Sequence, residues 1–274
     1  MELTQGEKTE ISELPDDLAG AVAELGAPVA TFKARGAALV VQMVLAPLLF
    51  FLGLAFVIVP IAFLIWGRMG GAAFKSFKLL ILGVILLPGA FAMVRRAYRD
   101  WGLQVLVFAD GLVRAQRDRV DAFFWDEIET VWRQKSQGAW GHLAKGTLVY
   151  TIRRARGDDV AFDSHLDGLK RLAELIEQST LPYMLPRCQE AFEGGEVIDF
   201  AKLQISTAGL GNGQEMLPWS EIKEVAVGAQ SVVIRKEGKM LSWHTAPRNE
   251  IPNFHVFLAL VRPILGGRLA VAND

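Results

Sequence analysis

The sequence predicts an α+β protein in which an N-terminal transmembrane helical hairpin precedes two strand-rich units, each closed by a C-terminal helix. Three observations lead to this fold class. Residues 37–66 and 79–94 are apolar blocks separated by a glycine-rich turn. The chain beyond residue 100 alternates short β-favouring runs with turn residues. A pattern of glycine turn, Trp and Glu-Ile occurs twice in that region, which is typical of a duplicated unit.

The N-terminal segment is acidic. Residues 1–30 carry seven acidic side chains against one lysine, which predicts a mobile tail. Residues 25–33 contain Pro28 and are compatible with a short extended piece. This piece either lies against a soluble domain or leads directly into the first apolar block.

Residues 31–99 predict the transmembrane hairpin. A helix needs about 20 apolar residues to cross a bilayer core, and residues 37–66 supply 30 with Gln42 as the one polar side chain. The second block becomes long enough when residues 72–78 are added and the two lysines there reach toward head groups. The alternatives are a buried hairpin in a soluble core and a cleaved signal peptide, for which the first block is too long and starts too late.

Basic residues near the spans set the expected orientation. The outer ends of the two spans carry five basic residues and the turn between them carries three, which favours a multi-pass membrane protein with both termini in the cytoplasm. Three of the five, Arg95, Arg96 and Arg99, follow the second span directly. They either bind anionic lipid or simply end the helix.

Residues 100–180 predict the first strand-rich unit. Short β-favouring runs separated by polar turns occupy residues 103–163, and the apolar period then changes to 3.6 over residues 166–176, which indicates a helix. Residues 181–195 hold two prolines and are expected to be a linker with a short helical pattern over residues 187–193.

Residues 196–267 predict the second unit, followed by a short tail at residues 268–274. Strand-like runs precede an amphipathic helix from residue 254, for which Asn253 is the expected N-cap and Gly266 marks the end.

The two units share specific residues. Gly111-Leu112 and Gly209-Leu210 follow the same kind of strand, and Trp125-Asp126-Glu127-Ile128 matches Trp219-Ser220-Glu221-Ile222. Each Trp is expected to close one end of a small barrel while its N–H finds a partner. Each Glu is expected to bond amides of its turn.

These residues, with the terminal helix of each unit, resemble the bacterial PH-like (pleckstrin-homology-like) domains. More narrowly, Leu217-Pro218-Trp219-Ser220-Glu221-Ile222, followed by Trp243 and Ile251-Pro252-Asn253, is similar to an uncharacterised family that pairs a two-span membrane hairpin with tandem PH-like domains. This likeness covers roughly residues 25–265. The resemblance implies two PH-like β-barrel or sandwich domains in a membrane context. It supplies no catalytic residues.

Residue patterns of known catalytic chemistry are absent from the sequence. The four histidines are scattered, no His-Glu-x-x-His or paired cysteines offer a zinc site, and Cys188 is the one cysteine. After Gly209-Leu210-Gly211-Asn212-Gly213, Gln214 stands where a dinucleotide loop has its last glycine, and strand residues follow instead of a helix, so a hairpin turn is expected. We therefore expect no catalytic residue, no metal and no cofactor.

One basic cluster is a candidate binding face. Arg114, Arg117 and Arg119 surround the second turn of the first unit. If these side chains share a face, they dock on the anionic inner leaflet. The alternative is that they keep strand edges charged and so prevent edge pairing.

The expected function is a membrane-anchored, non-enzymatic interaction module that presents tandem PH-like domains at the cytoplasmic face to protein or lipid partners. The net charge of −1 gives no basic signature for nucleic acid. Partners are therefore expected to be membrane lipid and an unidentified protein, and a homo-oligomer is compatible with the sequence. The alternative is an oligomeric small-molecule or ion carrier or channel component, although the spans contain no charge that would form a pathway.

Overall fold

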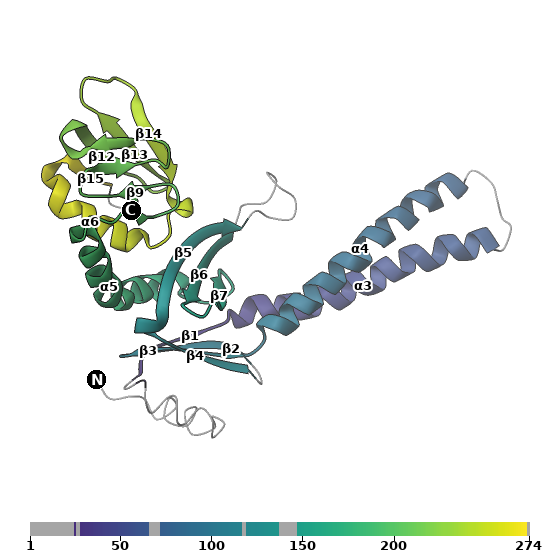
Figure 1. Cartoon of the computed structure of the whole chain (residues 1–274). Helices are drawn as coiled ribbons and strands as arrows, with labels where there is room; N and C mark the ends of the chain where they lie inside the picture. The colour runs from purple at the N-terminus through teal and green to yellow at the C-terminus, as the bar shows by residue number, and fades with distance from the viewer. Residues whose placement is uncertain (1–24, 26–27, 66–71, 117–118, 137–146, 273–274) are drawn as a thin grey trace.

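The computed structural model describes residue 25 and residues 28–65, 72–116, 119–136 and 147–272. Most of the segment expected to be an acidic tail therefore lies outside the described residues. A body of antiparallel sheets and helices carries a two-helix hairpin that projects away from it (Figure 1). The hairpin consists of α3 (Gly36–Ile65) and α4 (Ala72–Asp100). The mixed α+β class with two apolar helices is therefore confirmed.

The first unit is built from two antiparallel sheets and a helix. One sheet has the strand order β1-β2-β3-β4 and the other has the order β5-β6-β7. A 3-10 turn, η1, joins them, and α5 follows. The bounds are β1 (Pro28–Lys33), β2 (Leu103–Phe108), β3 (Gly111–Gln116), β4 (Arg119–Phe124), η1 (Trp125–Glu127), β5 (Ile128–Ser136), β6 (Thr147–Arg154), β7 (Asp159–Asp163) and α5 (Leu169–Glu193).

The second unit repeats this order on a smaller scale. Its first sheet runs β8-β9-β10-β11, and its second joins β12, β13 and β14. The bounds are β8 (Ile198–Asp199), β9 (Gln204–Ile205), β10 (Gly209–Gly211), β11 (Met216–Pro218), η3 (Trp219–Glu221), β12 (Ile222–Val227), β13 (Ser231–Lys236), β14 (Ser242–Pro247), η4 (Arg248–Glu250), α6 (Phe254–Leu265), η5 (Gly266–Arg268) and β15 (Leu269–Val271).

The expected barrel does not close among the described strands. The 3-10 turns η1 and η3 bend the chain between β4 and β5 and between β11 and β12, so each unit holds two separate sheets instead of one continuous ladder. The expected C-terminal tail also differs, because β15 pairs in parallel with β12. Arg268 holds this end of the chain by donating to the carbonyls of Trp219 and Ile222 at 2.7 and 3.0 Å.

The duplicated residues occupy matching places in the two units. Trp125 Nε1 donates to the Ala109 carbonyl at 3.0 Å, and Trp219 Nε1 donates to the Ser206 carbonyl at 3.0 Å. The expected partner for each indole N–H is therefore present. The β-strand that follows each Trp carries a register shift at its second residue, after Ile128 in one unit and after Ile222 in the other.

The hairpin lies inside the first unit. β1 precedes α3 in sequence, yet it pairs antiparallel with β2, which follows α4. In the second unit the corresponding strands β8 and β9 are joined by residues 200–203 alone. The two apolar helices therefore replace a short strand connection. Of the two alternatives for residues 25–33, the extended piece packed on the soluble body is the one observed, so residues 28–33 belong to the sheet and not to a tail or span.

The expected linker is helical. α5 continues through Pro182 and Pro186, which are exposed and lie four residues apart on one side of the helix. Proline removes a backbone N–H and leaves a carbonyl without its helical partner. On an exposed face water can satisfy that carbonyl, so the helix continues while Ile176, Thr180 and Met184 pack on its buried face.

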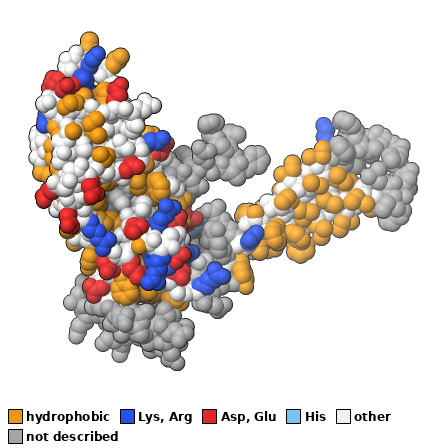
Figure 2. Space-filling view, viewed as in Figure 1, with side chains coloured by type: hydrophobic (Ala, Val, Ile, Leu, Met, Phe, Trp, Pro, Cys, Tyr) orange, Lys and Arg blue, Asp and Glu red, His pale blue; other side chains and the backbone are white. Residues whose placement is uncertain are grey.

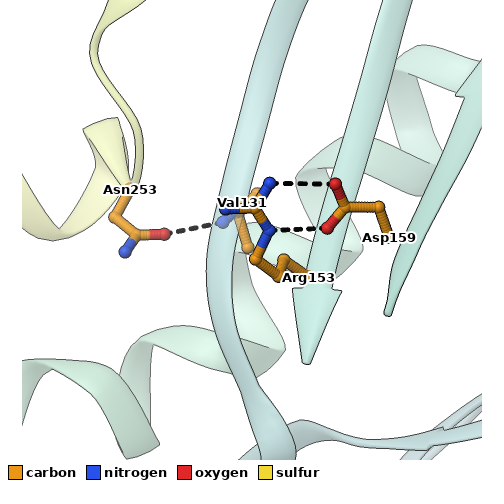
Figure 3. Close-up of polar contacts among 4 residues, drawn as sticks. All are labelled: Val131, Arg153, Asp159 and Asn253. Carbon is orange, nitrogen blue, oxygen red and sulfur yellow. Dashed lines mark hydrogen bonds and ion pairs between the residues drawn. The ribbon is translucent and has the colours of Figure 1, made fainter. Parts of the chain in front are cut away.

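Asn253 joins the two units instead of capping α6. It occupies the N-cap position with a left-handed backbone (φ 50°), but its side chain makes no capping bond. Its Oδ1 accepts from the Val131 N–H at 2.7 Å (Figure 3), and its Nδ2 donates to the Glu129 carbonyl at 2.8 Å. Its backbone N–H donates to the Val131 carbonyl at 2.8 Å. The residue thus pairs with the outer edge of β5 as a strand would.

A single hydrophobic cluster runs through both units. It extends from Phe32 of β1 to Leu265 of α6, and α5 packs against α6 within it (Figure 1). Across this contact His255 Nε2 lies 3.2 Å from Thr180 Oγ1, whose proton is donated to the Ile176 carbonyl at 2.7 Å. The threonine hydroxyl has no second proton, so the His255 Nε2–H is the donor in this contact.

The largely enclosed His255, which is half-buried, makes stability depend on pH. Burial lowers the pKa of His255 from 6.5 to about 4. The unfolded chain therefore takes up a proton near pH 6.5, whereas the folded chain does so only near pH 4. Above about pH 6.5 His255 is neutral in both states and costs no stability. As the pH falls from about 6.5 to about 4, we expect the free energy of unfolding to decrease by about 3 kcal/mol. Urea unfolding of wild type and His255→Gln across this range measures the difference, and equal pH slopes would contradict it.

Candidate membrane-proximal site

The hairpin exposes its apolar side chains. Figure 2 shows hydrophobic side chains covering the arm, whereas charged side chains are spread over the body. Within the part of the chain that the structure describes, two stretches are apolar enough to cross a membrane, Val40–Ala62 and Lys78–Arg95, and 17% and 11% of them are buried. A hairpin inside a soluble core would have most of its side chains buried, so the expected alternative of a buried core hairpin does not fit the described residues.

Small residues bring the two helices together. Gly53 of α3 and Gly83 of α4 are buried, and a Cβ on Gly83 would lie 2.8 Å from the Gly53 carbonyl oxygen. Ala46 and Ala90 are buried along the same contact. Close backbone approach at small residues is how helices pack in lipid, where no hydrophobic effect drives them together.

Backbone hydrogen bonds hold the base of the hairpin against the body. The chain leaves β1 at Lys33, and the next two residues are fixed by bonds from Ala34 N–H to the Leu103 carbonyl (3.0 Å) and from Arg35 N–H to the His165 carbonyl (2.7 Å). Asp167 N–H returns a bond to the Lys33 carbonyl at 2.9 Å. The turn before α5 is thus tied to the start of α3.

A cationic pocket opens at this base. It has a volume of about 510 Å³ and contains three cations, Lys33, Arg35 and Arg171, against one carboxylate, Asp167. It is lined by Thr31, Phe32, Lys33, Ala34, Arg35, Gly36, Asp167, Gly168 and Arg171. We call these residues the base pocket. Arg35 and Asp167 approach to 3.7 Å, but their side chains are 56% and 79% exposed, so the pair contributes little stability. The cations of the pocket still outnumber its carboxylate.

The base pocket stands at one end of the apolar arm. The first apolar stretch begins at Val40, four residues after Gly36, and the second ends at Arg95. Tyr98 and Trp101 follow Arg95 and are exposed. Aromatic and basic side chains at the end of an apolar helix are typical of the membrane–water interface.

The basic residues singled out from the sequence fall into different places. Arg95 is exposed near the base, whereas the side chains of Arg96 and Arg99 lie outside the described residues, as does all of Arg117. Arg119 begins β4 opposite Gln116, which itself pairs with Leu103, the first residue of β2 after the hairpin. Arg119 is therefore at the hairpin end of the sheet.

Arg114 lies two residues further from the hairpin, opposite Asp121. It is half-buried, pairs with Val105 across the sheet and donates to the Gln116 side chain at 2.7 Å. Arg119 and Arg95 therefore lie at the hairpin end of the molecule, while Arg114 occupies an interior position of the sheet.

Comparison with known proteins identifies a family. Residues 16–267 match the model of a family of unknown function, DUF6585. The chain belongs to the DUF6585 family. No curated protein matches it.

In this DUF6585 chain the base pocket was not apparent from the sequence. Lys33 and Arg35 were visible as charges flanking the first span, but Arg171 is carried by α5, far along the chain. No spacing rule connects them, because the connection is the tie between β1 and the turn before α5. The described residues of the DUF6585 chain contain no group of three or more His, Cys, Asp or Glu side chains arranged to hold a metal ion.

Proposed function

We propose that the protein is a membrane-anchored, non-enzymatic interaction module whose tandem PH-like units stand on the cytoplasmic face of a membrane for lipid or protein partners. The observation that carries the proposal is the exposed apolar hairpin inserted between β1 and β2. Because both of its ends continue into strands of one sheet, the first unit cannot move away from the anchoring surface.

The PH-like identity rests on the order of elements. Each unit has a four-stranded antiparallel sheet, a 3-10 turn that begins with Trp, further antiparallel strands and a helix. This order supports the resemblance drawn from the Trp and Gly residues, although the sheets remain separate among the described strands.

The base pocket supports a lipid partner. An anchored hairpin holds the pocket at head-group level, where anionic lipid contributes about 1 kcal/mol for each nearby Lys or Arg. If the arm spans the bilayer, the cations close enough to the head groups are Lys33, Arg35 and Arg171. The expected ligand is the phosphate of an anionic phospholipid, and the expected side of the membrane is the anionic cytoplasmic leaflet.

The lipid test uses the full chain in a non-ionic detergent. Adding a short-chain anionic phospholipid is expected to raise the melting temperature, while a zwitterionic lipid of equal chain length has little effect. The triple variant Lys33→Gln, Arg35→Gln, Arg171→Gln should lose most of the rise. A matched control, Lys223→Gln, Lys239→Gln, Arg262→Gln, removes three exposed charges of the second unit and should keep it. An equal response in both triple variants would reject lipid binding at the base pocket.

Orientation is tested separately. In a Cys188→Ser background, Gly70→Cys places a thiol between the two apolar helices. A membrane-impermeant maleimide added to intact cells should label Gly70→Cys but not Lys223→Cys in the second unit. Labelling of Lys223→Cys alone would place the body on the outer side.

A further inference from the structure

A second pocket lies where the two units meet, away from the hairpin base. It has a volume of about 220 Å³. It is lined by Arg133, Gln134, Leu148, Ala229, Gln230, Pro247, Arg248 and Asn249. We call these residues the junction pocket. The first three come from β5 and β6 of the first unit and the other five from the second, so the pocket exists only when the units are docked.

Hydrogen bonds and a ring contact between neighbouring segments hold the residues that line the junction pocket. Asn253 pairs with Val131 at the edge of β5 (Figure 3). Val131 lies two residues before Arg133 in β5, and Asn253 follows Arg248 by five residues. The Arg248 N–H donates to the Gln230 carbonyl at 2.8 Å, and its guanidinium lies over the Phe254 ring at 4.7 Å. Both arginines are half-buried.

Two arginines and one glutamate act on the Tyr150 hydroxyl at this junction. Arg133 lies directly opposite Tyr150 in the β5–β6 ladder, and the Tyr150 hydroxyl donates to Glu177 at 2.6 Å. Burial raises the pKa of Tyr150 and the Glu177 carboxylate raises it further, while Arg133 and Arg248 act in the opposite direction. Both guanidinium groups are therefore within electrostatic reach of one hydroxyl, with Glu177 as the acidic neighbour.

The lining has the chemistry of an oxyanion site. Among the described residues that line it are two guanidinium groups and three carboxamides, from Gln134, Gln230 and Asn249, and no carboxylate. A guanidinium presents parallel N–H donors that match the oxygens of a phosphate or carboxylate. The volume is below that of a typical pocket for a whole drug-sized ligand, about 300 Å³ or more. It suits one anionic group with the remainder of the ligand in solvent.

We propose that the junction pocket binds a soluble phosphate-bearing ligand whose oxyanion bridges Arg133 of the first unit and Arg248 of the second. A ligand that touches both units stabilises their docked arrangement, because it binds only where the two walls are together. The same chemistry is offered by lipid head groups, but the lining comes from β5, β6 and the second unit and not from the hairpin base.

Calorimetric titration of the full chain with inorganic phosphate, at ionic strength held constant with chloride, tests the proposal. Saturable binding is expected, and Arg133→Gln or Arg248→Gln should weaken it roughly tenfold or more. Arg248→Lys keeps the positive charge but loses the fork and the planar stacking on Phe254, so it should show an intermediate loss. Arg262→Gln removes an exposed charge outside the pocket and should bind as wild type does.

Three results would overturn the proposal. One is the absence of saturable binding to the wild type, and another is unchanged binding in both Arg133→Gln and Arg248→Gln variants that unfold as the wild type does. The third comes from the chain in lipid nanodiscs. Phosphate binding should be equal in anionic and zwitterionic discs, and its loss in anionic discs would assign the pocket to a lipid head group.

Discussion

Replacing Gly111 with alanine should destabilise the protein by about 3 kcal/mol or more. A Cβ at this position would lie 2.2 Å from the Phe123 carbonyl oxygen and 2.5 Å from a methyl group of Leu25. The first contact is to the backbone of the paired strand β4, so no side-chain rotation relieves it. The new methyl would push apart the two strands that position Trp125.

The second unit offers the matched variant. A Cβ on Gly209 would lie 2.0 Å from the Leu217 carbonyl oxygen, so Gly209→Ala should be similarly destabilising. Gly267→Ala is the control, because nothing lies within 4 Å of its Cβ position and its backbone is not left-handed. Urea unfolding in detergent, followed by Trp fluorescence, measures all three. The steric account fails if Gly111→Ala is as stable as Gly267→Ala.

Loss of the Asn253 side chain should uncouple the two units. Asn253→Ala removes the acceptor for Val131 N–H and the donor to the Glu129 carbonyl, and we expect a loss of about 2–4 kcal/mol from these two bonds. It also leaves an alanine in the left-handed backbone region, which costs roughly 1 kcal/mol more. Asn253→Gly avoids that strain, so its effect isolates the hydrogen bonds.

Scanning calorimetry of the full chain distinguishes coupling from stability alone. The wild type should unfold in a single transition, since one hydrophobic cluster runs through both units. Asn253→Gly should broaden or split that transition. A variant that keeps the wild-type melting temperature and transition width would show that the Asn253 contact does not couple the units.

Local patterns in the sequence predicted the elements well. The apolar blocks identified α3 and α4 because a helix that is apolar on all sides must be surrounded by a protein core or by lipid. The repeat could be identified because its residues have local roles. Gly111 and Gly209 allow two strands to approach closely, and the indole N–H groups of Trp125 and Trp219 each bond to a nearby carbonyl.

Contacts between distant segments were not predicted. An extended piece was expected over residues 25–33, but its pairing with β2 was not, because β2 lies beyond both helices. Asn253 has the residue type and position of a helix cap, and a local rule cannot reveal that β5 competes for the same side chain. The prolines of α5 suggested a linker because sequence alone does not show which helix face is exposed.

In the candidate sites, too, local features could be predicted from the sequence and contacts between distant segments could not. Charges that flank the spans were recognised, whereas the part played by Arg171 in the base pocket depends on how α5 is tied to β1. Likewise, Arg133 and Arg248 share a pocket only because the two units dock.

The most direct test of the anchor is to replace residues 36–101 with a short Gly-Ser turn. Because Ala34 N–H already bonds to the Leu103 carbonyl at 3.0 Å, the strands β1 and β2 are close enough for such a connection, as β8 and β9 are. Membrane sedimentation after an alkaline wash should find the full chain in the pellet and the shortened chain, folded by circular dichroism, in the supernatant. A full chain released by the wash, or a shortened chain that cannot fold, would contradict a membrane anchor inserted into a self-sufficient body.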